Sequence, residues 1–146
     1  MKVFADSSAL VKMYVNEVGS EQVIGLESVA ISAISRVEVL SAFWRKSNSD
    51  QILDTDVDLI VRAFESDLFG RGVDGRALFA VPASQQILGL AASLVSVHQL
   101  KTLDSIQLAS ALAARGADPD CQTFACFDQK LSRAARAHGF QVISTS

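Results

Sequence analysis

Short apolar runs alternate along this chain with longer segments in which apolar residues recur at helical spacing. Each run spans only about five residues, which is a usual length for a strand. The longer segments repeat apolar residues every three or four positions, as an amphipathic helix does. Strands that alternate with helices are typical of a parallel sheet covered by helices on both faces. The alternation therefore predicts an α/β fold.

The boundaries of the expected elements follow from this pattern. We predict strands at 3–5, 29–32, 77–81, 123–127 and 140–144. We predict helices at 7–15, 35–46, 52–68, 84–98, 103–115 and 129–138, with a loop at 70–76. Gly139 suits the C-terminal stop of the last helix. A chain of 146 residues without a repeat or a linker is expected to form a single domain, 1–146.

Composition bears on the cellular environment. Cys121 and Cys126 have no neighbours at zinc-site spacing, so we expect reduced, partly buried thiols in a cytoplasmic protein. The most apolar window, 77–97, is interrupted by Pro82 and by several polar residues, so we expect no membrane span. The net charge of −3 gives no overall attraction to nucleic acid, which leaves only local patches to bind it.

Four carboxylates lie at or near predicted helix starts, and each has a structural interpretation. Asp6 follows the first strand and suits the N-cap of the next helix. Glu38 stands three residues after Ser35, as in a capping box. Asp104 lies in the first turn of its helix, and Asp128 precedes the last helix as an N-cap would.

Their joint placement favours a second interpretation. All strands of a parallel sheet end at one edge, where the following helices begin and where open α/β sheets bind ligands. We therefore expect all four carboxylates at that edge. The helix that carries Asp104 is apolar nearly all round, so this carboxylate is expected to be buried, which is costly without a partner.

A divalent cation would remove the repulsion among clustered carboxylates. Oxygen ligands without His or Cys suit Mg²⁺ or Mn²⁺ rather than Zn²⁺. Such a metal takes further ligands from substrate phosphates, so the chemistry indicated is attack of water on a phosphodiester.

Basic residues flank this set. Arg36 and Arg45 lie on either side of Glu38, while Lys130 and Arg133 lie on the last helix with Arg136 at the same spacing. They could hold RNA phosphates, or they could form an ordinary solvated helix face. The sequence leaves both interpretations open.

At these residues the chain resembles the PIN-domain ribonucleases, in particular the VapC-like toxins of type II toxin–antitoxin systems. The matching segments are "DSSALVKMYVNE" at 6–17, "SRVEVLSAFWR" at 35–45, "LKTLDSIQLASAL" at 100–112 and "FACFDQKLSRAARAHGFQVI" at 124–143. They occur in the order and spacing of that family and together span nearly the whole chain.

The resemblance implies a three-layer α/β/α fold with a five-stranded parallel sheet of order 3-2-1-4-5. It implies RNA cleavage that depends on Mg²⁺ or Mn²⁺, inhibition by a cognate antitoxin, and a homodimer. The implied catalytic and metal-binding set is Asp6, Glu38, Asp104 and Asp128. In the implied strand order Asp6 is central and should reach both Asp104 and Asp128, and Ser8 would orient a carboxylate or a water.

Two other classes of function remain open. The chain could be a catalytically weak PIN-like module that binds or regulates protein partners, although such a module does not need the complete acidic set. It could also be a phosphatase of the haloacid dehalogenase type, which likewise begins with an aspartate after the first strand. That chemistry requires a second aspartate two residues on, where this chain has Ser8.

Overall fold

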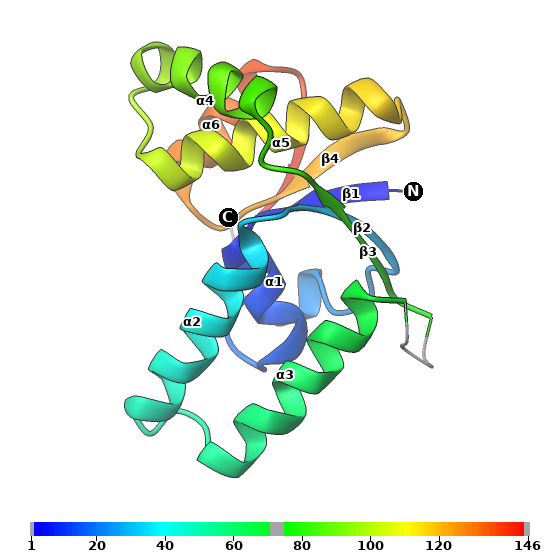
Figure 1. Ribbon diagram of the computed structural model, residues 1–146, viewed down its shortest axis with the longest axis vertical. Helices are drawn as coiled ribbons and strands as arrows, with labels where there is room; N and C mark the ends of the chain where they lie inside the picture. Colours follow the sequence, from blue (N-terminus) through cyan, green and yellow to red (C-terminus); the bar gives the residue numbers. More distant parts are fainter. Residues whose placement is uncertain (1, 71–74, 145–146) are drawn as a thin grey trace.

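A computed structural model describes residues 2–70 and 75–144 and has three layers, with a parallel sheet between two groups of helices (Figure 1). The strands are β1 (Lys2–Ala5), β2 (Ser28–Ser32), β3 (Ala77–Val81), β4 (Cys121–Ala125) and β5 (Gln141–Ile143). They lie in the order β3-β2-β1-β4-β5, so the predicted strand order is confirmed.

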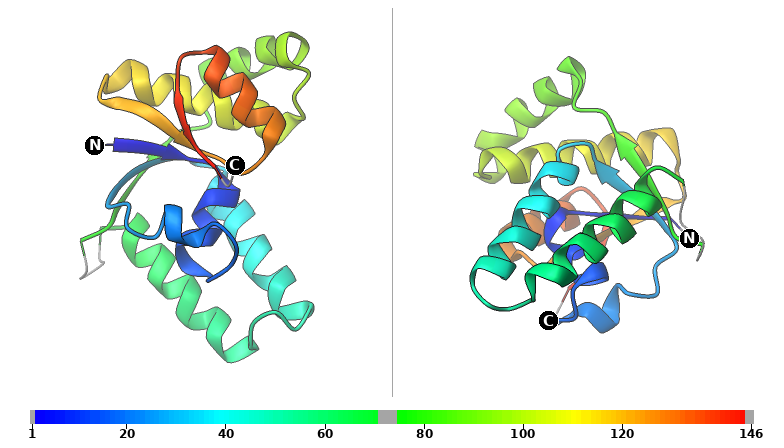
Figure 2. Two further views of the ribbon diagram at one scale, coloured as in Figure 1. Left: turned by 180° about the vertical axis from the view of Figure 1, so that it is seen from behind. Right: turned by 60° about the horizontal axis from the view of Figure 1, so that its bottom comes forward.

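Helices lie on both sides of the sheet, as Figure 1 and the view from behind in Figure 2 show. On one face lie α1 (Ser7–Tyr14), α2 (Ser35–Asn48) and α3 (Asp54–Leu68), and on the other lie α4 (Gln85–His98), α5 (Thr102–Ala117) and α6 (Gln129–Ala137). Each predicted helix is present. Among the described helices, none combines the length and apolar character that a membrane crossing requires.

The structure departs from the predicted elements in the bounds of β4 and in one additional short helix. β4 begins and ends two residues earlier than predicted, because Cys121 is already paired with Lys2 of β1 and is buried. A short 3₁₀ helix at Ser20–Gln22 was not predicted. Residues 71–74 of the predicted loop lie outside the described residues.

The sheet divides the apolar core into two clusters. On the α4–α6 face, Phe4 and Phe124 pack with ring centroids 5.2 Å apart, and Leu108 and Leu131 lie against them. The cluster on the α1–α3 face includes Val3, Leu10, Ile31, Val39 and Phe43. Strands β1, β2 and β4 are largely buried on both faces, as the short apolar runs predicted, whereas the edge strands β3 and β5 are partly exposed.

Helix α3 lies outside the four segments that carry the family resemblance, and aromatic packing holds it in place. The ring of Phe64 is 5.5 Å from that of Tyr14 and 6.3 Å from that of Phe43, and both contacts are edge-on. Tyr14 also donates a hydrogen bond of 2.6 Å to Asp67. Helix α3 is therefore tied to α1 and α2 through one aromatic cluster.

We expect Phe64→Ala to lower the free energy of unfolding by about 3–5 kcal/mol, the usual cost of deleting a fully buried aromatic ring. Chemical denaturation followed by circular dichroism measures this loss. Leu59→Ala is the matched control, because Leu59 lies on the same helix but is 63% exposed, whereas Phe64 is fully buried. Equal losses for the two variants would contradict the packing described here.

Candidate functional site

Asp6 lies where β1 ends and α1 begins, and it is 5% exposed. Its Oδ1 accepts hydrogen bonds from the Ala9 amide at 2.9 Å and from Ser8 Oγ at 2.7 Å. Its own amide donates to the carbonyl of Ala125 at the end of β4, at 3.1 Å. The predicted N-cap is therefore confirmed, and it uses only one carboxylate oxygen. The predicted role of Ser8 in orienting a carboxylate agrees with its contact.

Asp128 and Asp104 lie at the starts of two helices on the other side of the sheet. Asp128 is the N-cap of α6, as predicted, and its Oδ2 accepts from the Leu131 amide at 2.8 Å. Asp104 lies in the first turn of α5 and is half-buried, and no hydrogen bond from a described residue reaches its carboxylate. Asp104 therefore has both oxygens available.

Glu38 does not form the predicted capping box. Helix α2 begins at Ser35, its N-cap is Ile34, and no side chain caps it. Glu38 Oε1 instead accepts from Ser7 Oγ at 2.6 Å and from Gln107 Nε2 at 3.1 Å. The capping-box interpretation is wrong because Ser35 is the first residue of the helix rather than its N-cap, and Glu38 bonds to side chains of α1 and α5.

Burial and mutual repulsion perturb two of these carboxylates. Burial raises the pKa of Asp6 from 3.8 to about 6, against hydrogen bonds from Ala9, Ser8 and Cys126, and the charge of Asp104 adds to the rise. Burial also raises the pKa of Asp104, and so do the charges of Asp128 and Glu38. Asp104 therefore interacts electrostatically with the other three carboxylates.

The donor chemistry of this group fits a hard divalent cation. Every ligand would be a carboxylate oxygen. Amide and hydroxyl donors bond to one oxygen each of Asp6, Glu38 and Asp128, Cys126 adds a contact to Asp6, and no described hydrogen bond reaches Asp104. Within residues 2–70 and 75–144, no three His, Cys, Asp or Glu side chains converge closely enough to hold a metal ion. Binding a cation by this set therefore requires rotation of at least one of the more accessible carboxylates.

Several residues at the site were missed by the sequence analysis. Gln107, Ser7 and Ser35 join Glu38 in one hydrogen-bonded group. Cys126 is fully buried beside Asp6, and its thiol lies 3.5 Å from the carbonyl oxygen of Asp128. The sequence does contain a sign that Gln107 belongs to the site, because it is a large polar residue one turn after Asp104 on a predominantly apolar helix.

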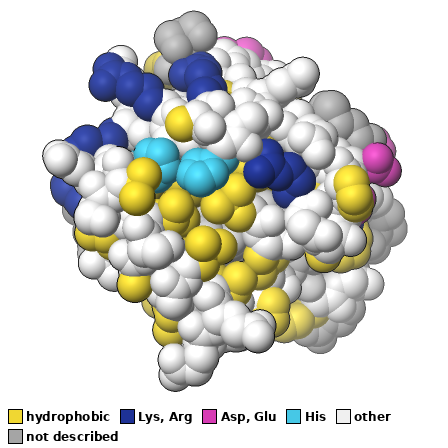
Figure 3. Space-filling view, turned by 90° about the horizontal axis from the view of Figure 1, so that it is seen from above, with side chains coloured by type: hydrophobic (Ala, Val, Ile, Leu, Met, Phe, Trp, Pro, Cys, Tyr) yellow, Lys and Arg dark blue, Asp and Glu magenta, His cyan; other side chains and the backbone are white. Residues whose placement is uncertain are grey.

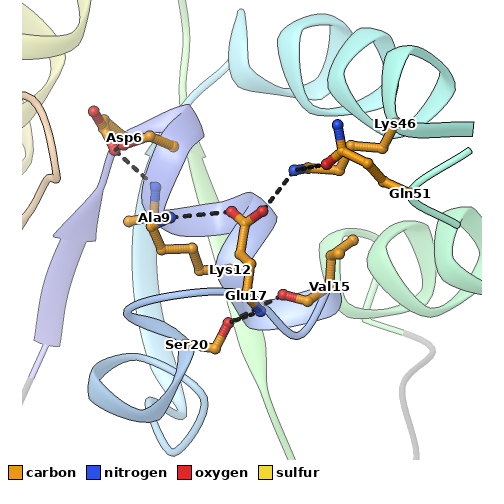
Figure 4. Close-up of polar contacts among 9 residues, drawn as sticks. Asp6, Ala9, Lys12, Val15, Glu17, Ser20, Lys46 and Gln51 are labelled. Carbon is orange, nitrogen blue, oxygen red and sulfur yellow. Dashed lines mark hydrogen bonds and ion pairs between the residues drawn. The ribbon is translucent and has the colours of Figure 1, made fainter. Parts of the chain in front are cut away.

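A cluster of ion pairs lies near the C-terminal end of α1 (Figure 4). Glu17 accepts from Lys12 at 3.0 Å and from Lys46 of α2 at 2.5 Å. The Lys12 ammonium also lies 4.9 Å from the ring centroid of Phe127, the residue before Asp128. The ion pairs therefore connect α1, which Asp6 caps, with α2, which carries Glu38.

The predicted basic residues have different surroundings. Arg36 pairs with Glu65 at 2.6 Å and lies over the ring of Phe69, so its charge is engaged by α3. Arg45 donates to Ser41, and both line a hollow of about 420 Å³ beside Glu38 whose other walls include Val37 and Leu103.

Lys130 and Arg133 are exposed on α6, and Lys130 donates to the carbonyl of Gln99 at 3.1 Å. Figure 3 shows Lys and Arg side chains on the face formed by the α4–α6 layer, around two adjacent histidines. These are His98 and His138, whose Nε2 atoms lie 2.9 Å apart. Neither histidine lies in the carboxylate group.

Comparisons with known proteins bear on the fold. No family model matches the chain, and a search of curated proteins finds no match. Among solved structures, a chain from "Toxin-antitoxin complex from Klebsiella pneumoniae" is similar, with a TM-score of 0.57 and 17% sequence identity over 89% of each chain. At this identity the similarity concerns the fold, which is an α/β fold with a parallel 3-2-1-4-5 sheet.

The raised pKa of Asp6 predicts a pH-dependent stability without metal. Because the folded state keeps the proton up to about pH 6 and the unfolded state only to about 3.8, the free energy of unfolding falls as pH rises between these values. Ionisation of Asp6 therefore lowers the free energy of unfolding by an amount on the order of 3 kcal/mol above pH 6. We expect Asp6→Asn to remove this pH-dependent loss of stability. Asparagine can keep the cap.

Thermal melts in EDTA from pH 4 to pH 8 measure this contribution. Asp120→Asn, a change at an exposed loop residue, should keep the wild-type pH profile. If Asp6→Asn kept that profile as well, the ionisation of Asp6 would not affect stability.

Proposed function

We propose that this protein is an endoribonuclease of the PIN type that depends on Mg²⁺ or Mn²⁺ and hydrolyses RNA phosphodiester bonds. The observation that carries the proposal is the interaction of Asp104 with Asp6, Glu38 and Asp128. Burial of Asp6, partial burial of Asp104 and the repulsion between carboxylates disfavour the ionised forms of these two groups in the folded protein, and a bound cation would offset that cost.

Each carboxylate has a proposed role. Asp6, Asp104 and Asp128 would hold the metal through the oxygens that do not cap helices, and Glu38 would complete the set or orient the attacking water. A bound Mg²⁺ or Mn²⁺ would stabilise the charge that develops on the phosphate. Ser8 would keep Asp6 in its rotamer through the hydrogen bond to Oδ1.

The proposal extends to partners and location. The fold similarity to a chain of a toxin–antitoxin complex supports the proposal that this protein is a cytoplasmic toxin with a cognate antitoxin. A homodimer is the oligomeric state we propose. Apolar side chains that α4 leaves exposed support such a contact, namely Leu88, Leu90, Val95 and Val97.

For RNA binding, we propose Arg45, Lys130 and Arg133 as phosphate contacts. Arg45 lines the hollow beside Glu38, and the other two are exposed on the helix that Asp128 caps. We give Arg36 a smaller part, because it is already paired with Glu65.

We expect purified protein to cleave RNA with Mn²⁺ and to lose at least about a hundredfold in rate on Asp6→Asn or Glu38→Gln, because each change removes a charge from the site without changing its shape. A fluorogenic RNA assay, with thermal melts beside it, measures both rate and folding. Asp120→Asn should cleave at the wild-type rate. A wild-type protein inactive with Mg²⁺ and with Mn²⁺ would favour the binding-module alternative.

Metal binding gives an independent test. We expect Mn²⁺ to bind with millimolar or tighter affinity, and Asp104→Asn to weaken binding by about tenfold or more, because Asp104 has both oxygens free and interacts electrostatically with the other three carboxylates. Isothermal titration calorimetry measures the affinity. Equal affinity for Asp104→Asn and wild type would remove Asp104 from the metal site, whatever the result of the cleavage assay.

A further inference from the structure

Gln107 is a polar side chain in the middle of the molecule. It lies on α5, one turn after Asp104, and is 2% exposed. The residues that follow it on α5 are apolar or small, and Leu108, Ala109, Ser110 and Ala111 are fully buried. A glutamine in such a place is costly unless its amide group is hydrogen-bonded.

The amide nitrogen of Gln107 is well supplied with acceptors. Nε2 lies 2.9 Å from Ser35 Oγ, 3.1 Å from Ser7 Oγ and 3.1 Å from Glu38 Oε1. Ser7 Oγ donates to the same Glu38 oxygen at 2.6 Å and lies 3.0 Å from Ser35 Oγ. Glu38 Oε1 is therefore held by an amide from α5 and a hydroxyl from α1.

The amide oxygen of Gln107 has the opposite situation. Oε1 is buried and has no hydrogen-bond partner among the described residues. Rotating the amide by half a turn would give Oε1 contacts to the serines but would place it against the Glu38 carboxylate, which is repulsive. The contact with Glu38 therefore fixes the amide orientation and leaves one buried acceptor unsatisfied, which costs free energy of folding.

We infer that Gln107 is a positioning residue for the carboxylate of Glu38. With Ser7, it holds Oε1 within the protein and leaves Oε2 free for the edge where Asp104 lies. Because Gln107 and Asp104 are one turn apart on α5, the helix that carries one carboxylate of the site also fixes the position of another. This role rests on the proposed function, since Glu38 must act at the metal site for its position to matter.

The test is a double-mutant cycle on Mn²⁺ affinity, measured by isothermal titration calorimetry. Gln107→Met keeps the length of the side chain and removes both donors, and we expect it to weaken Mn²⁺ binding by about tenfold, as loss of a hydrogen bond to a charged group does. In the Glu38→Gln background the same change should have less than about a twofold effect, because Gln107 acts through the Glu38 charge.

Two further variants separate positioning from folding. Ser7→Ala removes the other donor to the same oxygen and should show the same dependence on Glu38. Ser105→Ala is the control, since it removes a buried hydrogen bond of 2.8 Å from α5 to the carbonyl of Ala91 without touching Glu38. It should lower the melting temperature and leave the Mn²⁺ affinity unchanged.

RNA cleavage supplies a second readout. Because Gln107 is buried, we expect Gln107→Met to lower kcat by at least about tenfold and leave KM for RNA unchanged. A wild-type Mn²⁺ affinity in Gln107→Met, or equal losses in the two Glu38 backgrounds, would overturn the positioning role while the proposed function stands. A wild-type protein that neither binds Mn²⁺ nor cleaves RNA would overturn both.

Discussion

Burial of the Asp6 carboxylate between β1 and α1 is the constraint on which the rest of the site depends. The central strand β1 ends just before Asp6. The amide of Asp6 donates to the carbonyl of Ala125 at the end of β4, and the side chain of Asp6 caps α1. The same burial raises the pKa of Asp6 to about 6. The residue that starts the first helix therefore also places a poorly solvated carboxyl group at the sheet edge, where opposite charge would stabilise its ionised form.

In the proposed site, structural and chemical roles fall on the same side chains. Asp6 and Asp128 each cap a helix through one carboxylate oxygen. Capping alone is a common use of an aspartate, so neither residue by itself indicates a functional site. Asp104 differs, because it is half-buried, caps nothing and interacts with all three other carboxylates.

Helix α5 connects the two halves of the site across the sheet edge. It carries Asp104 near its start and Gln107 one turn later, and the amide of Gln107 reaches Glu38 of α2 and Ser7 of α1. Ser105 ties the same helix to α4 through the carbonyl of Ala91. The helix that carries Asp104 therefore also contacts the carboxylate of Glu38 through Gln107.

The sequence by itself determined the alternation of strands and helices and the N-caps at Asp6 and Asp128. These features depend on local periodicity and on local hydrogen bonds at helix starts. Local sequence patterns mispredicted the partners of a side chain where residues distant in the sequence form hydrogen bonds with it. Glu38 matched a capping box, yet Ser7 and Gln107, far away in the sequence, take its oxygen. Only the tertiary structure shows the hydrogen bonds of Glu38, the pairing of Cys121 with Lys2 and the contact of His98 with His138. Each of these contacts joins segments that are distant in the sequence and meet only when the chain folds.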